Sequence, residues 1–398
     1  MSRPLMRIPY TQPLPPPLII PPSASTKQGA IAALSHFLTT SAGHASSSRG
    51  NKTVLLTGAG ISVASGLADY RGQNGTYTQN KNYRPIYFHE FVASHEARKR
   101  YWARSFLGWR GLHRSSPNAT HFAIRDLGRL GLVDSVITQN VDSFHRLAHP
   151  ALHTVELHGY LRSLVCLSCK NLMDRDAFQA RLAELNPAWA AFLQELLRSG
   201  ALETENPVER RKRGFRTNPD GDADVPGAPY TMFRYPACPT CLKRPPILSD
   251  GSKGHVDVDK DGACIPSSTT TNGVGVLKPN VIMFGESIPA SVKTEAEAAI
   301  DAASKILVVG SSLATYSAWR LVKHAHERGM GIGILNMGGV RKEELFFGEH
   351  RHETGKSDGA HDGLSASRRE VVRASLPAEE ILPAVVDLVQ EHQNQHQY

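Results

Sequence analysis

The sequence has no long apolar run and little cysteine. No stretch approaches the roughly 18 consecutive apolar residues that a membrane-spanning helix needs, so we expect no membrane partner. Only five of the 398 residues are cysteines, which argues against a secreted scaffold held by disulfides. The net charge of +8 is modest, and its one dense basic run, at 209–216, is interpreted as a solvated loop or else as a docking or targeting patch. We therefore expect a soluble globular protein with no nucleic-acid partner, large enough for one large domain and a small one.

Acidic residues are absent from the N-terminal segment, where Asp69 is the first. Basic residues such as Arg3 and Arg7 stand there among many serines and threonines, a composition typical of a mitochondrial presequence. Prolines at 13–22 oppose this interpretation, because they would break a long amphipathic helix. Residues 27–38 favour the first helix of the fold, so any presequence is short. The composition of this segment leaves both interpretations open.

A glycine-containing turn follows an apolar run at 52–57 that is typical of a buried parallel strand. Gly58 and Gly60 let backbone N–H groups approach a phosphate closely, which is how a Rossmann-type fold holds the pyrophosphate of a dinucleotide. An ordinary dehydrogenase would need a third glycine where Val63 stands, and an acidic residue about 20 positions further on, where 79–82 read Gln-Asn-Lys-Asn. The turn therefore favours nucleotide binding and disfavours an oxidoreductase.

Strands and helices alternate along most of the chain. Expected strands lie at 53–57, 133–138, 305–310 and 331–336, and expected helices at 27–38, 89–106, 118–130, 291–303, 315–328 and 377–392. Such alternation predicts an α/β fold, a doubly wound parallel sheet of the Rossmann type with helices on both faces. We assign this domain to 27–160 and 277–392, after a proline-rich tail, 1–25, that should be extended and poorly ordered. A polar stretch at 349–369 is expected to be a flexible insertion.

The alternation fails between 161 and 276, which we interpret as a small module inserted into the large domain. It holds one helical stretch near 175–198 and loop-like insertions at 203–230 and 249–275. It also contains all five cysteines. The fifth of them, Cys264, stands among small polar residues, and we expect it to be exposed.

The other four cysteines form two Cys-x-x-Cys pairs, a spacing typical of zinc sites. Four thiolates suit tetrahedral Zn²⁺, and a complete shell of cysteines leaves no open coordination position, so the metal should be structural. We expect one Zn²⁺ per chain, bound by Cys166, Cys169, Cys238 and Cys241. A zinc-ribbon nucleic-acid binder is the alternative, but basic and aromatic residues do not interleave around these cysteines.

Several short motifs occur in a fixed order. They are GAGIS at 58–62, TQNVD at 138–142, LHG at 157–159, the two cysteine pairs, KPNVIMFGE at 278–286, VVGSSL at 308–313 and LNMG at 335–338. With these motifs the chain resembles the sirtuins, the NAD-dependent protein deacylases, over residues 27–390. Three further segments, 100–104, 108–109 and 186–189, look most like class II, the mitochondrial branch linked to lipoamidase, long- or branched-chain deacylase and ADP-ribosyltransferase activities.

The resemblance implies catalytic roles for three residues. His158 would be the general base that deprotonates a ribose hydroxyl, a task that suits an imidazole. Without the resemblance, a lone histidine after an apolar strand would be interpreted as an ordinary core residue. Asn140 and Asp142 would contact the nicotinamide ribose and the carboxamide, while Gln139 orients the ribose. Capping a strand end and starting a helix is the structural interpretation of Asp142, and both can hold.

The resemblance also implies that NAD is a consumed co-substrate. The NAD-binding residues implied in this way are Gly58, Ala59, Gly60, Ile61, Asp69, Arg71, Tyr77, Gln139, Asn140, Asp142, Gly310, Ser311, Ser312, Asn336, Met337, Gly338 and Ala378. Ala68 replaces the proline that the family usually has before its Asp-aromatic-Arg triplet. We expect this change to loosen the loop without removing its chemistry.

Two places are implied for the substrate. Phe284, Gly285 and Glu286 would offer a backbone edge to which an extended peptide adds as a strand. Tyr101 and Arg104 match the Tyr-x-x-Arg pattern that faces the acyl carboxylate in acidic-acyl sirtuins, and an i, i+3 pair shares one face of a helix. An ordinary exposed helical face is the alternative for this pair.

The implied function is NAD-dependent removal of acyl groups from protein lysines, with release of nicotinamide and O-acyl-ADP-ribose. Acylated lysine side chains of proteins would be the partners. ADP-ribosyl transfer to protein is the alternative among enzymes, because it shares the first step. A catalytically silent NAD- or zinc-dependent binding module is the alternative outside them, and intact His158 and Asn140 oppose it. The class II resemblance favours the mitochondrial matrix.

Overall fold

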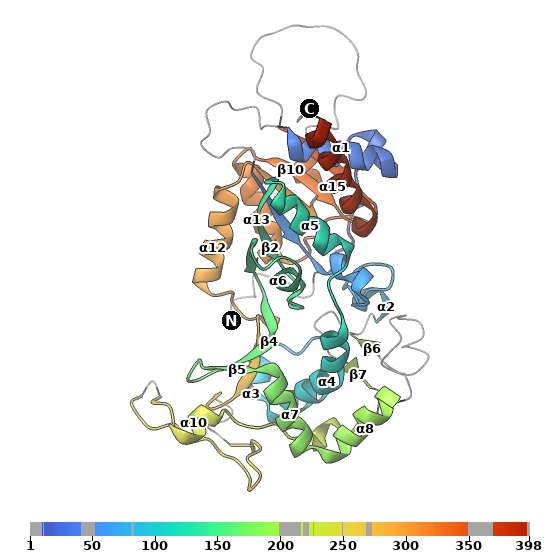
Figure 1. Ribbon diagram of the computed structural model, residues 1–398. Helices are drawn as coiled ribbons and strands as arrows, with labels where there is room; N and C mark the ends of the chain where they lie inside the picture. The colour runs from blue at the N-terminus through green and yellow to red at the C-terminus, as the bar shows by residue number, and fades with distance from the viewer. Residues whose placement is uncertain are drawn as a thin grey trace.

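A computed structural model describes residues 10, 12–40, 52–80, 83–198, 216–217, 223–225, 227–248, 250–267, 273–348 and 369–395. Most of the insertion expected at 203–230 and almost all of that at 349–369 lie outside the described residues, as does the start of the proline-rich tail. The described residues form a large domain, at the top of Figure 1, and a smaller module below it. None of the helices described is both long enough and apolar enough to cross a membrane.

A six-stranded parallel sheet forms the centre of the large domain, in the order β11-β10-β9-β1-β2-β3. Its strands are β1 (Thr53–Thr57), β2 (Val133–Thr138), β3 (His153–Glu156), β9 (Lys305–Val309), β10 (Gly331–Leu335) and β11 (Val371–Ala374). The strands β1, β9 and β10 are buried along their whole length, which explains why their sequences are nearly continuous apolar runs. The predicted doubly wound sheet is confirmed, with β3 and β11 as additional strands at its two edges.

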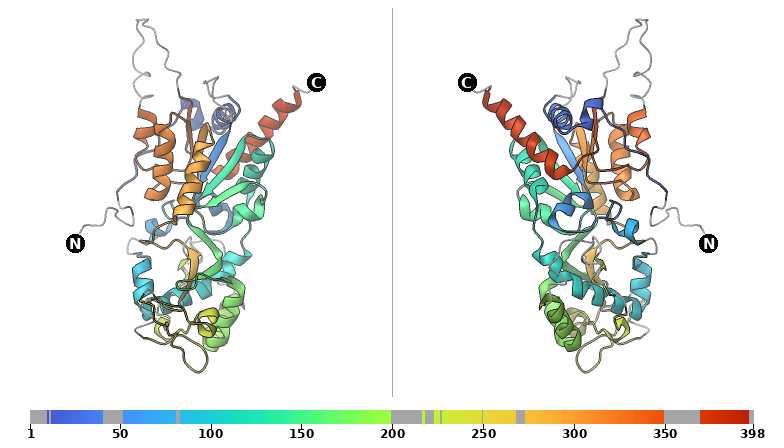
Figure 2. Two further views of the ribbon diagram at one scale, coloured as in Figure 1. Left: turned by 90° about the vertical axis from the view of Figure 1, so that its left-hand side faces the viewer. Right: turned by 90° about the vertical axis from the view of Figure 1, so that its right-hand side faces the viewer.

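Helices cover both faces of this sheet, because successive side chains of a strand point to opposite faces. In β1, Leu55 packs in a cluster with α1, α5 and α15, whereas Val54 and Leu56 pack with α12, α13 and α14. Figure 2 shows the two helix layers on opposite sides of the sheet. The helices are α1 (Lys27–Thr39), α5 (Ala119–Arg129), α12 (Ala290–Asp301), α13 (Tyr316–Glu327), α14 (Glu344–Phe347) and α15 (Ala378–Gln395).

The strand order reverses between β1 and β9, which places a crevice at the carboxyl ends of these strands. The chain leaves β1 at Gly58 and enters a 3₁₀ helix, η2 (Ala59–Ser65), and it leaves β9 at Gly310. A Cβ atom at Gly58 or at Gly60 would lie 2.8 Å from the carbonyl oxygen of Gly310, and Gly310 itself has a φ of +61°. Glycine at these positions is therefore what lets the two turns approach each other.

The smaller module is built around a three-stranded antiparallel sheet in the order β5-β4-β8. Its elements are α3 (Phe88–Ala93), α4 (His95–Arg114), β4 (Gly159–Cys166), β5 (Leu172–Asp174), α7 (Arg175–Leu185), α8 (Pro187–Arg198), η3 (Tyr230–Met232), α10 (Pro239–Lys243) and β8 (Leu277–Val281). Its core contains many aromatic rings, and the ring centroids of Trp102 and Phe178 lie 4.6 Å apart. The sequence analysis placed α3 and α4 in the large domain, but their apolar side chains share a core with α7 and β4.

The helical stretch expected near 175–198 is two helices that meet at Pro187. The Asn186 side chain ends α7 by donating to the carbonyls of Leu182 (2.8 Å) and Arg234 (2.7 Å). Proline has no N–H and suits the first position of the helix that follows. Shorter elements are η1 (Pro22–Ser25), α2 (Thr76–Gln79), α6 (Phe144–Ala148), and the paired strands β6 (Arg216–Thr217) and β7 (Ala223–Asp224).

The described part of the proline-rich segment packs against the large domain instead of forming a loose tail. Ile20 pairs antiparallel with Arg373 of the edge strand β11, through backbone hydrogen bonds of 2.9 and 2.7 Å. Ala24 is fully buried, and the Leu18 N–H donates to the carboxylate of Glu343 (3.1 Å). The open edge of β11 explains the difference, because its backbone N–H and C=O groups can pair with an extended segment.

Candidate active site and zinc centre

Polar groups from the ends of three strands converge at the crevice. Gln139 follows β2, and its amide donates to the Ser311 hydroxyl after β9 (2.7 Å) and to the Thr57 carbonyl at the end of β1 (3.2 Å). Its amide oxygen accepts from the hydroxyl of Thr315, just before α13 (3.0 Å). The fold thus brings predicted NAD-binding residues from separate strands together. The other predicted residues on the turns after β1 and β9 are Ala59, Ile61 and Ser312.

Asn140 and Asp142 lie beside the glycine turn and are joined through Ser62. The Asn140 amide donates to the Gly58 carbonyl (3.1 Å) and to Ser62 Oγ (3.2 Å), and the Ser62 hydroxyl donates to Asp142 (2.7 Å). Burial raises the pKa of Asp142, although hydrogen bonds from Phe144 and Ser62 oppose it. The Phe144 N–H donates to the Asp142 carboxylate at the start of α6, so Asp142 does help to start this helix, although its N-cap is Ser143. No role was predicted for Ser62, although its place in the GAGIS motif was the available signal.

His158 lies between β3 and β4, and both of its ring nitrogens have partners. Nδ1 lies 3.1 Å from the carbonyl oxygen of Gln139, and Nε2 lies 2.9 Å from Oγ of Ser317. Because a carbonyl oxygen can only accept, Nδ1 carries the proton and Nε2 keeps its lone pair. Burial lowers the pKa of His158 to about 4, against an opposing effect of the Gln139 carbonyl. The imidazole is therefore neutral near pH 7 and can accept a proton at Nε2.

The predicted peptide-binding residues follow β8 and lie beside this histidine, because the Ile282 N–H donates to the His158 carbonyl (2.8 Å). Gly285 is exposed and has a φ of +82°. The Phe284 carbonyl accepts from the first N–H of α3 (2.9 Å), and the Glu286 carboxylate forms an ion pair with a buried lysine (3.2 Å). Some of the hydrogen-bonding groups on this edge are therefore already used within the protein.

The loop that contains the predicted NAD-binding residues Asp69 and Arg71 is held by hydrogen bonds of its own. The Asp69 carboxylate oxygens accept from the Gly72 N–H (3.1 and 3.0 Å). Burial raises the pKa of Asp69. The Arg71 guanidinium lies over the Tyr77 ring, 5.0 Å from its centroid. Arg71 also donates to the backbone carbonyl of Tyr10 (3.4 Å), a contact that the sequence analysis missed. Asp69 is thus bonded to its own loop, while Arg71 joins that loop to the N-terminal segment.

The residues predicted to line the adenosine lie after β10 and at the start of α15. Asn336 is buried and Met337 is 66% exposed. The Gly338 N–H donates to the hydroxyl of Ser375 (3.1 Å). Ala378, in contrast, is buried within the hydrophobic cluster between the sheet and α15. Of the residues predicted to line the adenosine, those in the loop after β10 therefore lie near the end of the sheet, whereas Ala378 belongs to the core.

A buried ion pair supports this loop. The Arg373 guanidinium donates to the carbonyls of Asn336 (3.0 Å) and Gly338 (2.6 Å) and pairs with Glu343. The side chains of Arg373 and Glu343 are almost completely buried. The sequence analysis missed this pair, because the two charged residues lie far apart in the chain and outside every motif.

Tyr101 and Arg104 lie one turn apart on α4, and each is only 7% exposed. The Tyr101 ring packs edge-on against Phe91, with centroids 5.3 Å apart. The alternative interpretation, an ordinary exposed helical face, is therefore wrong for this pair. Arg100, just before them on the same helix, does lie on the exposed side.

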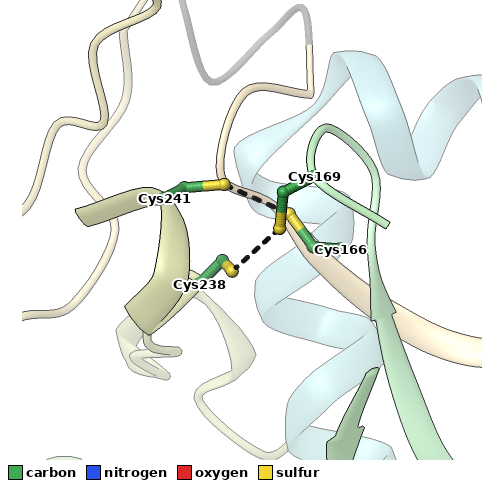
Figure 3. Close-up of side chains that lie close together, drawn as sticks. All are labelled: Cys166, Cys169, Cys238 and Cys241. Carbon is green, nitrogen blue, oxygen red and sulfur yellow. Dashed lines mark hydrogen bonds between the residues drawn. The ribbon is translucent and has the colours of Figure 1, made fainter. Parts of the chain in front are cut away.

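The four predicted zinc ligands meet at one point, as Figure 3 shows, two from the end of β4 and the turn after it and two from the start of α10. Their sulfur atoms all lie within 4.8 Å of one another. The Cys166–Cys241 distance is 3.6 Å and the Cys169–Cys238 distance is 3.7 Å. A tetrahedral Zn²⁺ with Zn–S bonds of about 2.3 Å requires sulfur atoms about 3.8 Å apart. The four thiols therefore fit a structural Zn²⁺ with no open position.

Cys264 is buried, at 6% exposure, and the expectation that it is exposed is wrong. Its N–H donates to the Tyr235 carbonyl (2.9 Å), and it forms a β-bridge with Val258. The small polar neighbours of Cys264 suggested a surface loop. Pairing within the module instead folds this part of the insertion inward.

Three buried histidines form a cluster next to Thr57, the residue before the glycine turn: His121, His145 and His149. Nε2 of His145 lies 2.8 Å from Oγ1 of Thr57, and its Nδ1 lies 2.9 Å from Nε2 of His149. The rings of His121 and His145 are 5.2 Å apart. Burial lowers the pKa of all three, to about 3 for His121. All three imidazoles are therefore neutral in the folded protein near pH 7.

The Sir2 family model matches residues 58–317 of this chain. An NAD-dependent protein deacylase of Batrachochytrium dendrobatidis is 40% identical over 298 residues, which cover 74% of this chain and 83% of that protein. An NAD-dependent protein deacetylase of Bordetella bronchiseptica is 35% identical and covers 73% of this chain and 85% of its own. The chain belongs to the Sir2 family.

Solved Sir2 structures share the fold of this sirtuin. A structure of a Sir2 enzyme aligns with a TM-score of 0.51 at 24% identity, covering 91% of this chain and 98% of that one. A complex of a Sir2 homologue with ADP-ribose aligns with a TM-score of 0.51 at 21% identity, covering 91% and 97%. At these identities the likeness concerns the fold alone.

From the zinc site we predict that removal of the metal also destabilises the fold. We expect the purified protein to contain one Zn²⁺ per chain, and a strong chelator to lower its melting temperature, because structural zinc contributes directly to folding free energy. Cys238→Ser should lose most of the zinc, whereas Cys264→Ser, the matched control, should keep it. Metal analysis and thermal unfolding test this. A zinc-free protein, or an unchanged melting temperature after chelation, would show that the site is misassigned.

The buried histidines predict that the sirtuin is destabilised by acid. Their folded pKa values lie below the unfolded value of about 6.5, so unfolding binds protons and stability falls as the pH drops below that value. Each histidine contributes at most about 1.4 kcal/mol per pH unit in that range. In urea unfolding between pH 7 and 5, His149→Gln should therefore reduce this slope, whereas the exposed control His392→Gln should not. An identical slope in the two variants would exclude the cluster as its source.

Proposed function

We propose that this sirtuin removes acyl groups from lysine side chains of proteins and consumes NAD in doing so. The observation that carries the proposal is the state of His158, a neutral imidazole with its Nε2 lone pair directed away from Gln139, beside the crevice of a Sir2 fold. The relatives named NAD-dependent deacylase and deacetylase support the same reaction.

The residues at the crevice fit NAD. A Cβ at Gly58 or Gly60 would collide with the turn after β9, so the backbone itself lines the crevice and its N–H groups can approach a pyrophosphate. Asn140, which is buried, and the Ser311 hydroxyl supply side-chain polar groups at the same place. When bound, NAD supplies a ribose carbon from which nicotinamide can leave.

His158 moves the proton in this proposal. Its Nε2 takes the proton of a substrate ribose hydroxyl, and the Gln139 carbonyl, which accepts the Nδ1–H, faces the positive charge that then develops on the ring. The Gln139 side chain is bonded to the ends of β1 and β9 and to Thr315, so the carbonyl has a fixed position. Asn140 and Asp142 bind and orient the co-substrate next to this base.

Deacylation is preferred to the two alternatives. ADP-ribosyl transfer shares the NAD site, but the relatives named above are deacylases and deacetylases. A catalytically silent module would not require a base held at both ring nitrogens. The mitochondrial address stays a prediction. If the address is mitochondrial, we expect the presequence to end before Ile20, which is paired to β11.

His158→Ala should abolish deacylation while NAD still binds. Loss of a positioned general base costs on the order of 10²–10⁴ in rate, and the histidine is not among the residues that hold the dinucleotide. Nicotinamide and deacylated peptide would be measured by mass spectrometry, and NAD affinity by calorimetry. The control is His153→Ala, an exposed histidine on the preceding strand. A His158 variant within a few-fold of wild type would remove this residue from the mechanism.

We further propose a class II acyl pocket with a preference for longer or carboxyl-bearing acyl groups. Tyr101 and Arg104 support it, because they lie together on α4 and are both withdrawn from the surface. A guanidinium in such a place attracts a carboxylate at the end of a glutaryl-type chain. A charge-assisted contact of this kind contributes about 1.5–3 kcal/mol, which is roughly ten- to a hundredfold in selectivity.

Arg104→Met should remove the advantage of carboxyl-bearing acyl groups over acetyl. An acetyl group is too short to reach the guanidinium, so its turnover should be weak in the wild type and little changed in the variant. The measurement is kcat/KM on peptides that differ only in the acyl group. Arg100→Met, on the exposed side of the same helix, is the matched control. Acetyl-lysine as the best substrate, or an unchanged ranking in Arg104→Met, would contradict the pocket while leaving the deacylase proposal intact.

A further inference from the structure

The hydrogen bond between Ser317 and His158 involves the very atom that the proposed base uses. Ser317 is the second residue of α13 and is half-buried, with its Oγ 2.9 Å from Nε2 of His158. Nδ1–H is already donated to Gln139, so Nε2 has only a lone pair to offer. The Ser317 hydroxyl is therefore the donor while the imidazole is neutral. No sequence motif assigned a role to this serine.

A hydroxyl has a property that the carbonyl on the other side of the ring lacks, because it can donate or accept after a rotation of its hydrogen. When Nε2 gains a proton, the same Ser317 oxygen can accept the new N–H without movement of any heavy atom. A hydrogen bond to a charged group is about twice as strong as one between neutral groups. Ser317 therefore stabilises the imidazolium more than the imidazole.

An acceptor at Nε2 matters because the surroundings of His158 disfavour its charged form. Burial disfavours the charged ring, and among the described residues no titratable group contributes to the shift of its pKa. Nε2 also faces the first turn of α13, whose partial positive charge opposes a cation. The Gln139 carbonyl compensates at Nδ1, and among the described residues Ser317 alone has an oxygen within hydrogen-bond distance of Nε2.

The position of Ser317 is linked to that of Gln139. Thr315 occupies the N-cap of α13, but its hydroxyl donates to the side chain of Gln139 and accepts no hydrogen bond from the helix. The start of α13 is therefore bonded to the residue that holds Nδ1 of His158. This arrangement fixes both partners of the imidazole relative to each other.

We propose that Ser317 is a positioning residue for His158, whose hydroxyl donates to Nε2 in the neutral ring and accepts from it after proton transfer. The proton passes from the substrate hydroxyl oxygen to Nε2, the ring gains one positive charge, and the serine hydrogen turns away as Nε2 is protonated. The inference rests on the proposed function, because it takes His158 as the base.

Ser317→Ala should lower kcat about tenfold, the effect of one lost hydrogen bond, while the KM for NAD and its calorimetric affinity stay unchanged. Ser317→Thr keeps the hydroxyl and should restore kcat. In the ¹⁵N NMR spectrum of the free protein at pH 7.5, the Nε2 resonance of His158 should move toward that of an unbonded imidazole nitrogen in the alanine variant only. Ser304→Ala is the matched control. Ser304 lies just before β9, at the end of this strand opposite to the crevice, and its hydroxyl donates to the backbone carbonyl of Lys52.

Any one of four outcomes would overturn the inference. The first is a Ser317→Ala kcat within twofold of wild type, and the second is an unmoved Nε2 resonance. The third is a failure of threonine to rescue kcat in a protein with the wild-type melting temperature. An alanine variant with a higher kcat would mean that Ser317 only blocks the lone pair. A wild-type protein without NAD-dependent deacylation, in contrast, would overturn the proposed function and the catalytic part of this inference, while the NMR result would still establish the hydrogen bond.

Discussion

The close approach of two glycine turns, at the point where the strand order reverses, is the constraint on which the rest of the structure depends. Gly58 and Gly60 follow β1, Gly310 follows β9, and a side chain at any of them would collide with the other turn. This contact brings the carboxyl ends of β1, β2 and β9 close enough for Gln139, which follows β2, to bond to groups at the ends of both β1 and β9. A wider separation would leave the backbone too far from a dinucleotide and would break this hydrogen-bond network. The crevice is therefore a consequence of sheet topology and not of any single side chain.

The site built on this crevice is made of neutral or buried polar groups, each with a partner that fixes its state. His158 is held neutral by burial, and its tautomer is set by the Gln139 carbonyl. Asp142 is buried and bonded to Ser62. Hydrogen bonds are stronger in such surroundings than in water, and a polar group left without one is costly. Burial likewise lowers the pKa values of the histidine cluster next to Thr57. Protonation of these histidines in acid should therefore destabilise the start of the glycine turn.

The smaller module completes the site from the other side. Its zinc ligands hold the end of β4 next to α10, and its core packs α4 against α7. These contacts fix the positions of β4 and β8. These two strands lead directly to His158 and to the segment around Phe284. A metal that takes no part in chemistry can thus affect catalysis by setting where the base and the peptide edge lie. On the opposite edge of the sheet, the N-terminal segment and the Arg373–Glu343 pair support the loop after β10.

The sequence by itself determined the parts of this protein that local pattern encodes. The apolar runs of β1, β9 and β10, the glycine turn and the two cysteine pairs depend on residues close together in the chain, so the parallel sheet and the zinc site were predictable. Only the tertiary structure decided what depends on distant residues. Pairing with β11 turned a proline-rich tail into a packed segment, and shared aromatic packing placed α3 and α4 in the smaller module. The burial of Cys264, of Tyr101 and of Arg104, and the meeting of Ser317 with His158, likewise follow from contacts between segments that no local pattern records. Burial and hydrogen-bond partners are properties of the packed chain: burial lowers the pKa of His158, and the Gln139 carbonyl sets its tautomer.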